Sequence, residues 1–214
     1  MINLRPRPFD PLLLVEGEDD KHVIRHLSER WDRSLEFAIK DYEGIENVLP
    51  SIRDHIDELG RPAVGVVVDA DGNALNTWNR VCARIRESEQ AVSPIPTAPD
   101  PEGTIIPENP NTGSPRIGIW VMPDNVSPGE LEGFVSHMIP ATDRVWPLSQ
   151  QYIDNIPTNE RKFAESKTIR AQIHAWLATR EDPRQMGLAI RTRDLAVNNP
   201  LSQTFLRWLS RLFA

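Results

Sequence analysis

"LLLVEGEDDKHVI", residues 12–24, joins a predicted buried strand to a predicted helix. Residues 12–15 are a short apolar run that is typical of a strand covered on both faces. Apolar residues then recur at helical spacing within residues 22–31. Between the two elements, four acids fall within five residues. This pattern predicts a strand–turn–helix unit whose turn is a candidate functional site.

The same alternation of strands and helices continues along the chain. The predicted strands lie at residues 35–41, 64–68 and 117–122, and the predicted helices at residues 45–60, 77–89 and 128–138. Strands that alternate with helices favour parallel pairing. We therefore expect an α/β fold in which a parallel sheet of about four strands is flanked by helices on both faces.

Two segments depart from this alternation. Residues 93–115 hold seven prolines in 23 residues, a density that no regular central element tolerates, so they predict a surface insertion with a short hairpin around 104–106. After residue 150 the pattern becomes helical, with apolar stripes that are typical of core packing. We expect one α/β domain at residues 1–149 and a helical C-terminal extension, residues 150–214, packed on it.

Composition limits the function classes. The chain has 214 residues, of which 39% are hydrophobic, so it can bury a core. Its start lacks the apolar run of a secretion signal, and no segment approaches the ~18 apolar residues that span a bilayer, so we expect a cytoplasmic protein without membrane contact. The single cysteine, Cys82, allows no internal disulfide and no cysteine-based zinc site.

Charge is unevenly distributed along the chain. The net charge of −7 argues against indiscriminate binding of nucleic acid, because Lys and Arg supply most of the affinity for phosphates. However, residues 161–214 hold ten basic and four acidic residues, a net +6, which leaves −13 for residues 1–160. A basic C-terminal third could position an anionic polymer over an acidic centre. The alternative is an ordinary solvated helical surface.

Acids follow the predicted strands at the points where ligands bind in parallel sheets. They are Glu16 and Asp20 after the first strand, Asp69 and Asp71 after the third, Asp124 after the fourth, and Glu130 and Glu132 further on. So many carboxylates at one edge would repel one another unless a cation neutralised them, and oxygen ligands favour Mg²⁺ or Mn²⁺. Asp20, Glu130 and Glu132 can also be explained as acids that favour the first turn of a helix.

Two motifs resemble a known family. "LLLVEG", with Glu16, and "VVVDAD", with Asp69 and Asp71, resemble over residues 10–140 the TOPRIM fold of topoisomerases, primases and OLD-type nucleases. "PGELEGF" and Lys167 in "RKFAESKTIRAQIHAWL" resemble the OLD nuclease branch and its small stand-alone relatives. The resemblance implies a TOPRIM-like sheet and metal-dependent phosphodiester chemistry.

The resemblance also implies roles for individual residues. Glu16, Asp69 and Asp71 would be the catalytic ligands of two Mg²⁺ or Mn²⁺ ions, with Glu130 or Glu132 completing the second and with Asp20 and Asp124 as further candidates. Lys167 would stabilise charge on the phosphate, and Gly17 would allow the sharp turn after the first strand. From the charge distribution we expect Arg161, Lys162 and Arg170 to contact nucleic acid.

The expected activity is hydrolysis of nucleic acid, most simply DNA, by a TOPRIM-type nuclease or nickase. No P-loop motif is present in the sequence, so any dependence on ATP would require a separate ATPase partner, and a homodimer is also left open. One alternative is a module of this fold that binds metal and nucleic acid or protein without cleavage. A third interpretation takes "VVVDADGNAL" alone, which resembles the nucleophile motif of haloacid-dehalogenase-like phosphatases.

Overall fold

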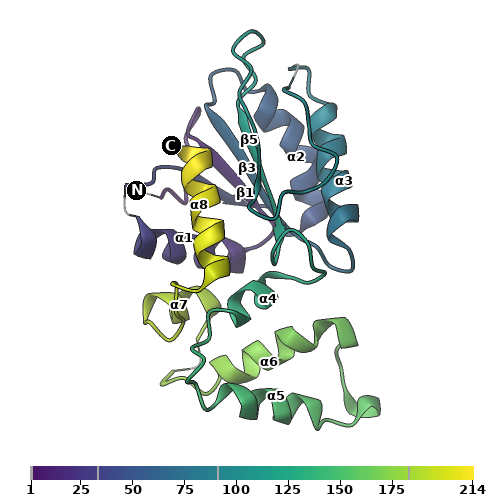
Figure 1. Cartoon of the computed structure of the whole chain (residues 1–214), viewed down its shortest axis with the longest axis vertical. Helices are drawn as coiled ribbons and strands as arrows, with labels where there is room; N and C mark the ends of the chain where they lie inside the picture. Colours follow the sequence, from purple (N-terminus) through teal and green to yellow (C-terminus); the bar gives the residue numbers. More distant parts are fainter. Residues whose placement is uncertain (1, 33, 91, 183) are drawn as a thin grey trace.

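The computed structural model describes residues 2–32, 34–90, 92–182 and 184–214 and has an α/β fold (Figure 1). Its central sheet has the strand order β2-β1-β3-β5-β4. The strands are β1 (Leu12–Val15), β2 (Ala38–Asp41), β3 (Ala63–Asp69), β4 (Thr104–Ile106) and β5 (Arg116–Met122). All neighbours pair in parallel except β4 and β5. The α/β class and the mostly parallel sheet are thus confirmed, with a fifth strand added at one edge.

Helices cover both faces of the sheet, as Figure 1 shows. One face carries α2 (Ile45–Asp57) and α3 (Ala74–Arg86), and the other carries α1 (Glu18–Trp31), α4 (Leu131–Ser136), α7 (Met186–Arg191) and α8 (Pro200–Phe213). Alternate strand residues face alternate cores: Leu13 and Val15 contact the α1 side, and Leu12 and Leu14 the α2 side. Burial on both faces explains the continuous apolar runs of the strands.

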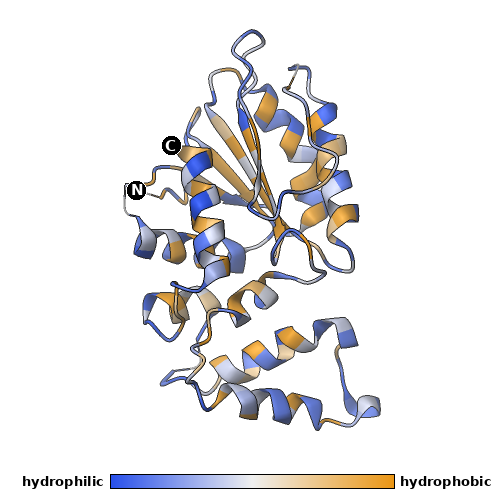
Figure 2. Ribbon diagram, in the orientation of Figure 1, coloured by the Kyte–Doolittle hydropathy of each residue, from blue (hydrophilic) through white to orange (hydrophobic). Residues whose placement is uncertain are grey.

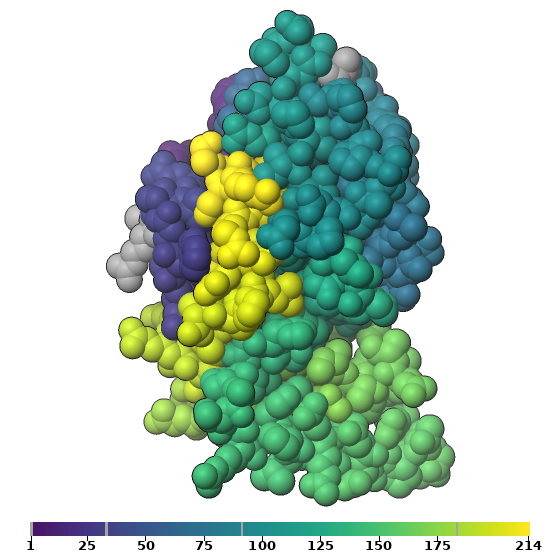
Figure 3. Space-filling view, viewed as in Figure 1, coloured from purple at the N-terminus to yellow at the C-terminus, as the bar shows by residue number. Residues whose placement is uncertain are grey.

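Helix α8 belongs to the core of the sheet domain. It lies across the sheet face between α1 and the proline-rich segment (Figure 3), with the Trp208 indole N–H donating to the Thr104 carbonyl at 3.0 Å. Gly65 and Gly118 are paired across β3 and β5, and a Cβ at either would come within 3 Å of the Leu212 side chain. The two glycines therefore open the space into which α8 packs.

The proline-rich segment, 93–115, is more than a surface insertion. Its expected hairpin is present, because β4 pairs antiparallel with β5. Thr104 and Ile106 are buried, and Arg211 of α8 donates to the Glu102 carbonyl at 2.6 Å. The segment thus supplies the edge of the sheet and part of the seat of α8, which the proline density alone did not indicate.

The residues after α4 separate into two parts. α5 (Trp146–Asp154) and α6 (Thr168–Leu177), with the short 3-10 turns η1 (Thr158–Glu160) and η2 (Glu165–Lys167), form a lobe beyond α4, at the bottom of Figure 1. In Figure 2 the apolar residues of this lobe concentrate on α6. The expected boundary between residues 149 and 150 falls inside α5, whereas α7 packs against α1 and α8 against the sheet.

Some element ends differ from the predictions. α1 begins at Glu18, before residue 22, because the acids after β1 occupy its first turn. α4 begins at Leu131, so Pro128 precedes the helix and does not open it. In the described part of the chain, no helix is long and apolar enough to cross a bilayer.

Candidate metal and phosphodiester site

Four carboxylates meet at the carboxyl edge of the sheet. Glu16 follows β1, Asp20 lies in the first turn of α1, Asp69 ends β3 and Glu132 lies in the first turn of α4. Asp20 and Glu132 are 7% and 3% exposed, although both are acids. Strands and helices far apart in the sequence therefore bring negative charge to one place, as the strand-end pattern predicted.

Backbone amides hold one oxygen of each of three carboxylates. The Asp69 amide donates to Glu16 Oε1 at 2.8 Å, and the Leu131 amide donates to Asp69 Oδ1 at 3.0 Å. The Gly17 amide donates to Asp20 Oδ2 at 3.1 Å. These bonds connect β1 to β3 and β3 to α4, so the carboxylates are positioned by main chain.

Burial and mutual repulsion change the protonation of this acid cluster. Burial, together with repulsion from Asp20 and Glu16, raises the pKa of Asp69 from 3.8 to about 9. Burial, followed by repulsion from Glu16 and Glu132, raises the pKa of Asp20 from 3.8 to about 7. Burial also raises the pKa of Glu16. Without a cation, the cluster therefore binds protons that isolated carboxylates would release.

Two basic residues of the α5–α6 lobe contact the edge of the cluster. Lys167 Nζ contacts Glu130 Oε1 and lies 3.2 Å from Asp71 Oδ1. Arg170 Nε lies 2.9 Å from Glu132 Oε1, and its Nη1 lies 4.0 Å from Glu130 Oε2. The lobe thus neutralises the outer acids, whereas the described residues provide no ion pair for Glu16, Asp20 or Asp69.

An open cleft of about 280 Å³ gives access to the acids. It is lined by residues of α1, β3, α4, α6 and the start of α7, among them Asp20, Asp69, Glu132 and Arg170. Within the described ranges, no three acids, histidines or cysteines are already arranged to hold a metal ion. The donors fit Mg²⁺ or Mn²⁺ in chemistry, because all are carboxylate oxygens, but a bound ion would have to draw them closer.

Some predicted site residues lie elsewhere or act differently. Asp124 accepts the Val126 and Ser127 amides at 3.0 and 2.7 Å, so it stabilises its own loop. Asp71 has a side chain that is 61% exposed and is paired with Lys167. Gly17 has an extended backbone, φ −142°, which any residue adopts, so the turn does not need the conformational freedom of glycine that we expected.

The three predicted nucleic-acid contacts also differ from one another. Arg170 is engaged with Glu132, as described above. Arg161 donates to the carbonyls of Ile156 and Asp154 at 3.0 and 2.9 Å, which orders the turn between α5 and η1. Lys162 is exposed. Arg170 is exposed as well, with 52% of its side chain accessible, whereas Arg161 is half-buried.

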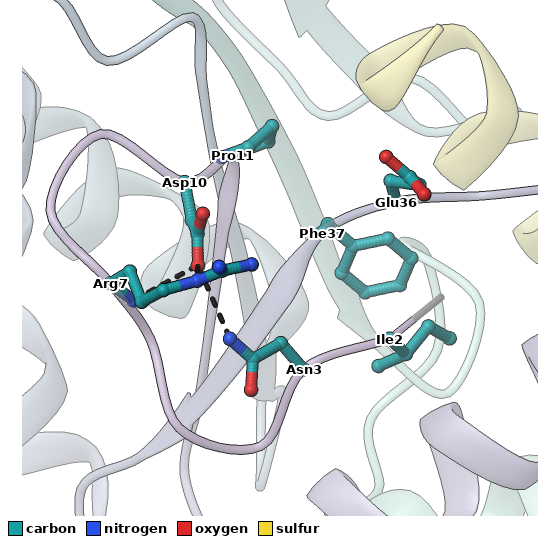
Figure 4. A pocket seen from close by; sticks show the side chains of 7 residues that line it. All are labelled: Ile2, Asn3, Arg7, Asp10, Pro11, Glu36 and Phe37. Carbon is teal, nitrogen blue, oxygen red and sulfur yellow. Dashed lines mark hydrogen bonds and ion pairs between the residues drawn. The ribbon is translucent and has the colours of Figure 1, made fainter.

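A second cavity, of about 470 Å³, lies at the amino ends of β1 and β2 (Figure 4). Asp10 accepts the Arg7 amide at 2.9 Å and the Asn3 side-chain amide at 3.3 Å there. These bonds close the loop before β1. Because ligands of parallel sheets bind at the opposite, carboxyl ends, this cavity is not the candidate site.

Sequence reasoning missed the depth of Asp20 and the role of the Leu131 amide. A first-turn acid is normally exposed, and only its closeness to Glu16 in "EGEDD" indicated that Asp20 could turn inward. The Leu131 hydrogen bond joins residues 62 positions apart, so no local pattern contains it. Both were determined by tertiary packing.

Comparison with known proteins gave one match. Residues 10–214 match the family model described as "Protein of unknown function (DUF3226)". The chain therefore belongs to the DUF3226 family. No curated protein and no solved structure matched the chain.

Proposed function

We propose that this DUF3226 member hydrolyses phosphodiester bonds of nucleic acid with the help of a divalent metal, as a TOPRIM-like nuclease or nickase. The supporting order is Glu16 after β1 and Asp69-Ala70-Asp71 at the end of β3, on neighbouring parallel strands. A separate ATPase partner is compatible with this proposal but is not required by it.

One observation carries the proposal: Glu16, Asp20 and Asp69 are crowded together without an ion-pair partner among the described residues. Such a cluster destabilises a fold through burial and repulsion unless a cation or protons neutralise it. The raised pKa of Asp69 is consistent with this cost. Charge that is costly to the fold is typical of functional sites.

Mg²⁺ or Mn²⁺ would be held by Glu16, Asp69 and Asp20 or Glu132, and when bound would activate water and neutralise phosphate oxygens. The backbone amides that fix Glu16 and Asp69 would keep their carboxylates oriented. Lys167 lies at the rim, between Asp71 and Glu130, and would donate hydrogen bonds to the phosphate as negative charge develops.

The first test measures metal binding and cleavage together. Calorimetry with Mn²⁺ and nicking of supercoiled plasmid in Mg²⁺ or Mn²⁺ should both succeed with the wild-type chain. Glu16→Gln and Asp69→Asn should each abolish nicking, because each removes a charged oxygen ligand but keeps an acceptor for the same backbone amide. Both variants should remain folded.

Asp124→Asn is the matched control. Asp124 also follows a strand of the sheet, but it is held by its own loop, so its amide variant should nick plasmid at the wild-type rate. Wild-type protein that binds no Mn²⁺ and nicks neither DNA nor RNA would refute the proposal.

A second candidate is a module that binds without cleavage. It is favoured by the ion pairs of Lys167 with Glu130 and of Arg170 with Glu132, which already neutralise two of the acids. This candidate predicts that the wild type binds nucleic acid with or without metal but never cuts it.

A further inference from the structure

Another cavity, of about 450 Å³ and lined by charged residues, lies between α1 and the end of α7. Its lining residues are Arg25, His26, Glu29 and Arg30 from α1, Arg191 at the end of α7, and Arg193. Four arginines thus line one space. No local sequence pattern indicates this site, because the two groups of arginines are about 160 residues apart.

The acids near this cavity do not neutralise it. Glu29 is paired with Arg25 Nε at 2.9 Å. Asp194 is paired with Arg184 Nε at 3.3 Å and accepts the Thr192 hydroxyl at 2.6 Å. Three arginines, Arg30, Arg191 and Arg193, are therefore left as excess positive charge. Burial lowers the pKa of His26, so its ring adds no charge at neutral pH.

Arg193 occupies a position where the backbone favours glycine. Its φ is +70°, and its amide donates to the Ile190 carbonyl at 3.2 Å, which ends α7 in the left-handed conformation. An arginine in this conformation costs the fold about 1 kcal/mol relative to glycine. Glycine can therefore replace Arg193 without backbone strain, so the contribution of the guanidinium group can be tested separately.

Arg30 is fixed by two backbone carbonyl groups. Its Nη1 donates to the carbonyls of Ile190 and Leu195, at 3.0 and 3.1 Å, so the guanidinium is fixed between α1 and the chain that follows α7. Because the group is anchored before any ligand arrives, little side-chain entropy would be lost on binding. Burial and repulsion from Arg193 lower the pKa of Arg30. An anion bound between the two guanidinium groups would reduce this repulsion.

The cavity is in line with the acid cluster. Both sites are lined by α1 and α7: Asp20 and Met186 at one end, Arg30 and Arg191 at the other. The rise of a helix places Arg30 about 15 Å from Asp20 along α1. Phosphates of one strand of a B-form duplex advance about 3.4 Å each, so a strand from the acids would reach the arginines after about four nucleotides.

We infer that this cavity, lined by Arg25, Arg30, Arg191 and Arg193, binds backbone phosphates of a nucleic-acid strand that leads to the acid cluster. That the bound strand continues to the acid cluster rests on the function proposed above, whereas binding of phosphates in the cavity does not. The ligand class follows from the guanidinium groups, which suit phosphate oxygens in geometry and charge.

The test uses the full chain in EDTA, so that no cleavage occurs, and a short fluorescent DNA duplex. Arg191→Gln with Arg193→Gly should raise Kd roughly tenfold at low salt and reduce the log–log salt slope by about 0.9 for each phosphate that the variant no longer binds. Arg193→Gly should not lower the melting temperature, because glycine suits φ +70°.

Arg84→Gln with Arg86→Gln is the control, since it removes the same charge from α3 on the opposite face of the sheet. Its Kd and salt slope should stay near the wild-type values. Equal effects of the two double variants would overturn the inference, because they would show that only net charge matters.

Two further outcomes separate the possibilities. In the first, inorganic phosphate raises the wild-type melting temperature, but the Arg191 and Arg193 substitutions leave oligonucleotide binding unchanged. This outcome would assign the cavity to a small phosphate ligand and overturn the nucleic-acid inference. Loss of oligonucleotide binding in the variant, with no cleavage by the wild type in any metal, would support the cavity and refute only the proposed nuclease.

Discussion

Asp69 and Asp20 make the stability of the metal-free protein depend on pH. Their pKa values are raised from 3.8 to about 9 and about 7, so the folded chain holds protons that the unfolded chain has released. The free energy of unfolding should therefore fall as the pH rises from about 4 to about 9, by roughly 1.4 kcal/mol per pH unit for each proton held. Urea denaturation in EDTA across this range measures the slope.

The variants identify the groups that cause this slope. Asp69→Asn should flatten it between about pH 7 and 9, where Asp69 still holds its proton and Asp20 has released its own, and should stabilise the metal-free protein at the alkaline end. Asp124→Asn should leave it unchanged, because hydrogen bonds from its own loop lower the pKa of Asp124 and it titrates below this range. A slope that Asp69→Asn does not alter would contradict the protonation described here.

Lys167 should act on the reacting phosphate more than on substrate affinity. Under the proposed activity, Lys167→Gln should lower kcat by about 10²-fold with Kd for DNA nearly unchanged, because the charge is needed as the transition state forms. Lys162→Gln, at an exposed position of the same segment, is the matched control and should have little effect on kcat. Equal losses in kcat and affinity for Lys167→Gln would make Lys167 a phosphate anchor.

Individual residues were predictable where local rules decide their position. Glu16 and Asp69 follow buried strands, and this placement alone brings them to the carboxyl edge of the sheet. Arg170 was predicted as a surface contact because its segment is basic; it is exposed, and it also pairs with Glu132, which the sequence did not indicate. Which acid faces which base depends on how the lobe docks on α4, and that docking has no local signature.

Glycines set how closely the elements pack. Gly103 has φ +83°, and a Cβ there would lie 2.9 Å from Trp208 Cβ and closer still to its ring, whereas Gly113 has φ +79° with its nearest neighbour at 3.5 Å. Gly113→Ala should cost about 1–2 kcal/mol for the backbone alone. Gly103→Ala should cost a further ~1–3 kcal/mol, because it also displaces α8.

Urea denaturation of both variants, with circular dichroism as the probe, gives the difference directly. Equal destabilisation would show that α8 adapts at no cost and that Trp208 is not tightly seated. Gly72→Ala is a further control, since no atom lies within 4 Å of the added methyl group and φ is not positive.

Element types were predictable to the extent that burial fixes composition. The runs in β1, β3 and β5 are apolar because helices cover both faces of these strands, so periodicity identified them nearly to the residue. β4 was expected only as a small hairpin in a surface insertion, because seven surrounding prolines hide its pairing with β5. The packing of α8 on the sheet depends on Gly65 and Gly118, and this role can be recognised only once the pairing of β3 with β5 is known.

At the scale of the molecule, the C-terminal third consists of two parts that differ in burial. α8 buries Ser202, Phe205, Leu206, Trp208, Leu209 and Leu212. In the lobe, α5 buries Ser149 and Ile153, and α6 joins the main core through Ile173, Trp176 and Leu177. Helical periodicity was the same signal in both, so the sequence could not separate a core helix from a lobe helix. The lobe nevertheless supplies Lys167 and Arg170 to the edge of the acid cluster.

This difference predicts two levels of stability. Because α5 exposes Leu148 and Tyr152 at 61% and 65%, the α5–α6 lobe should open at a lower free energy than α8, which should exchange only with global unfolding. Hydrogen exchange at increasing denaturant concentrations, read by mass spectrometry, measures both. Peptides from α5 should merge with those of β3, β5 and α8 only near the unfolding midpoint.

Opening of the α5–α6 lobe would also affect access to the acid cluster, and hydrogen exchange can test this. Lys167 and Arg170 would leave Glu130 and Glu132 when the lobe opens, and this would expose the acids to metal and to a nucleic-acid strand. Glu132→Gln removes one of these ion pairs and should lower the opening free energy of α6, while that of α8 stays unchanged. Glu102→Gln is the control: it removes only an exposed ion pair with Arg207, so the opening free energies of both helices should stay at their wild-type values. Exchange of α5, α6 and α8 at one common free energy would show instead that lobe and sheet unfold as one unit, and access to the acids would then have to come through the existing cleft.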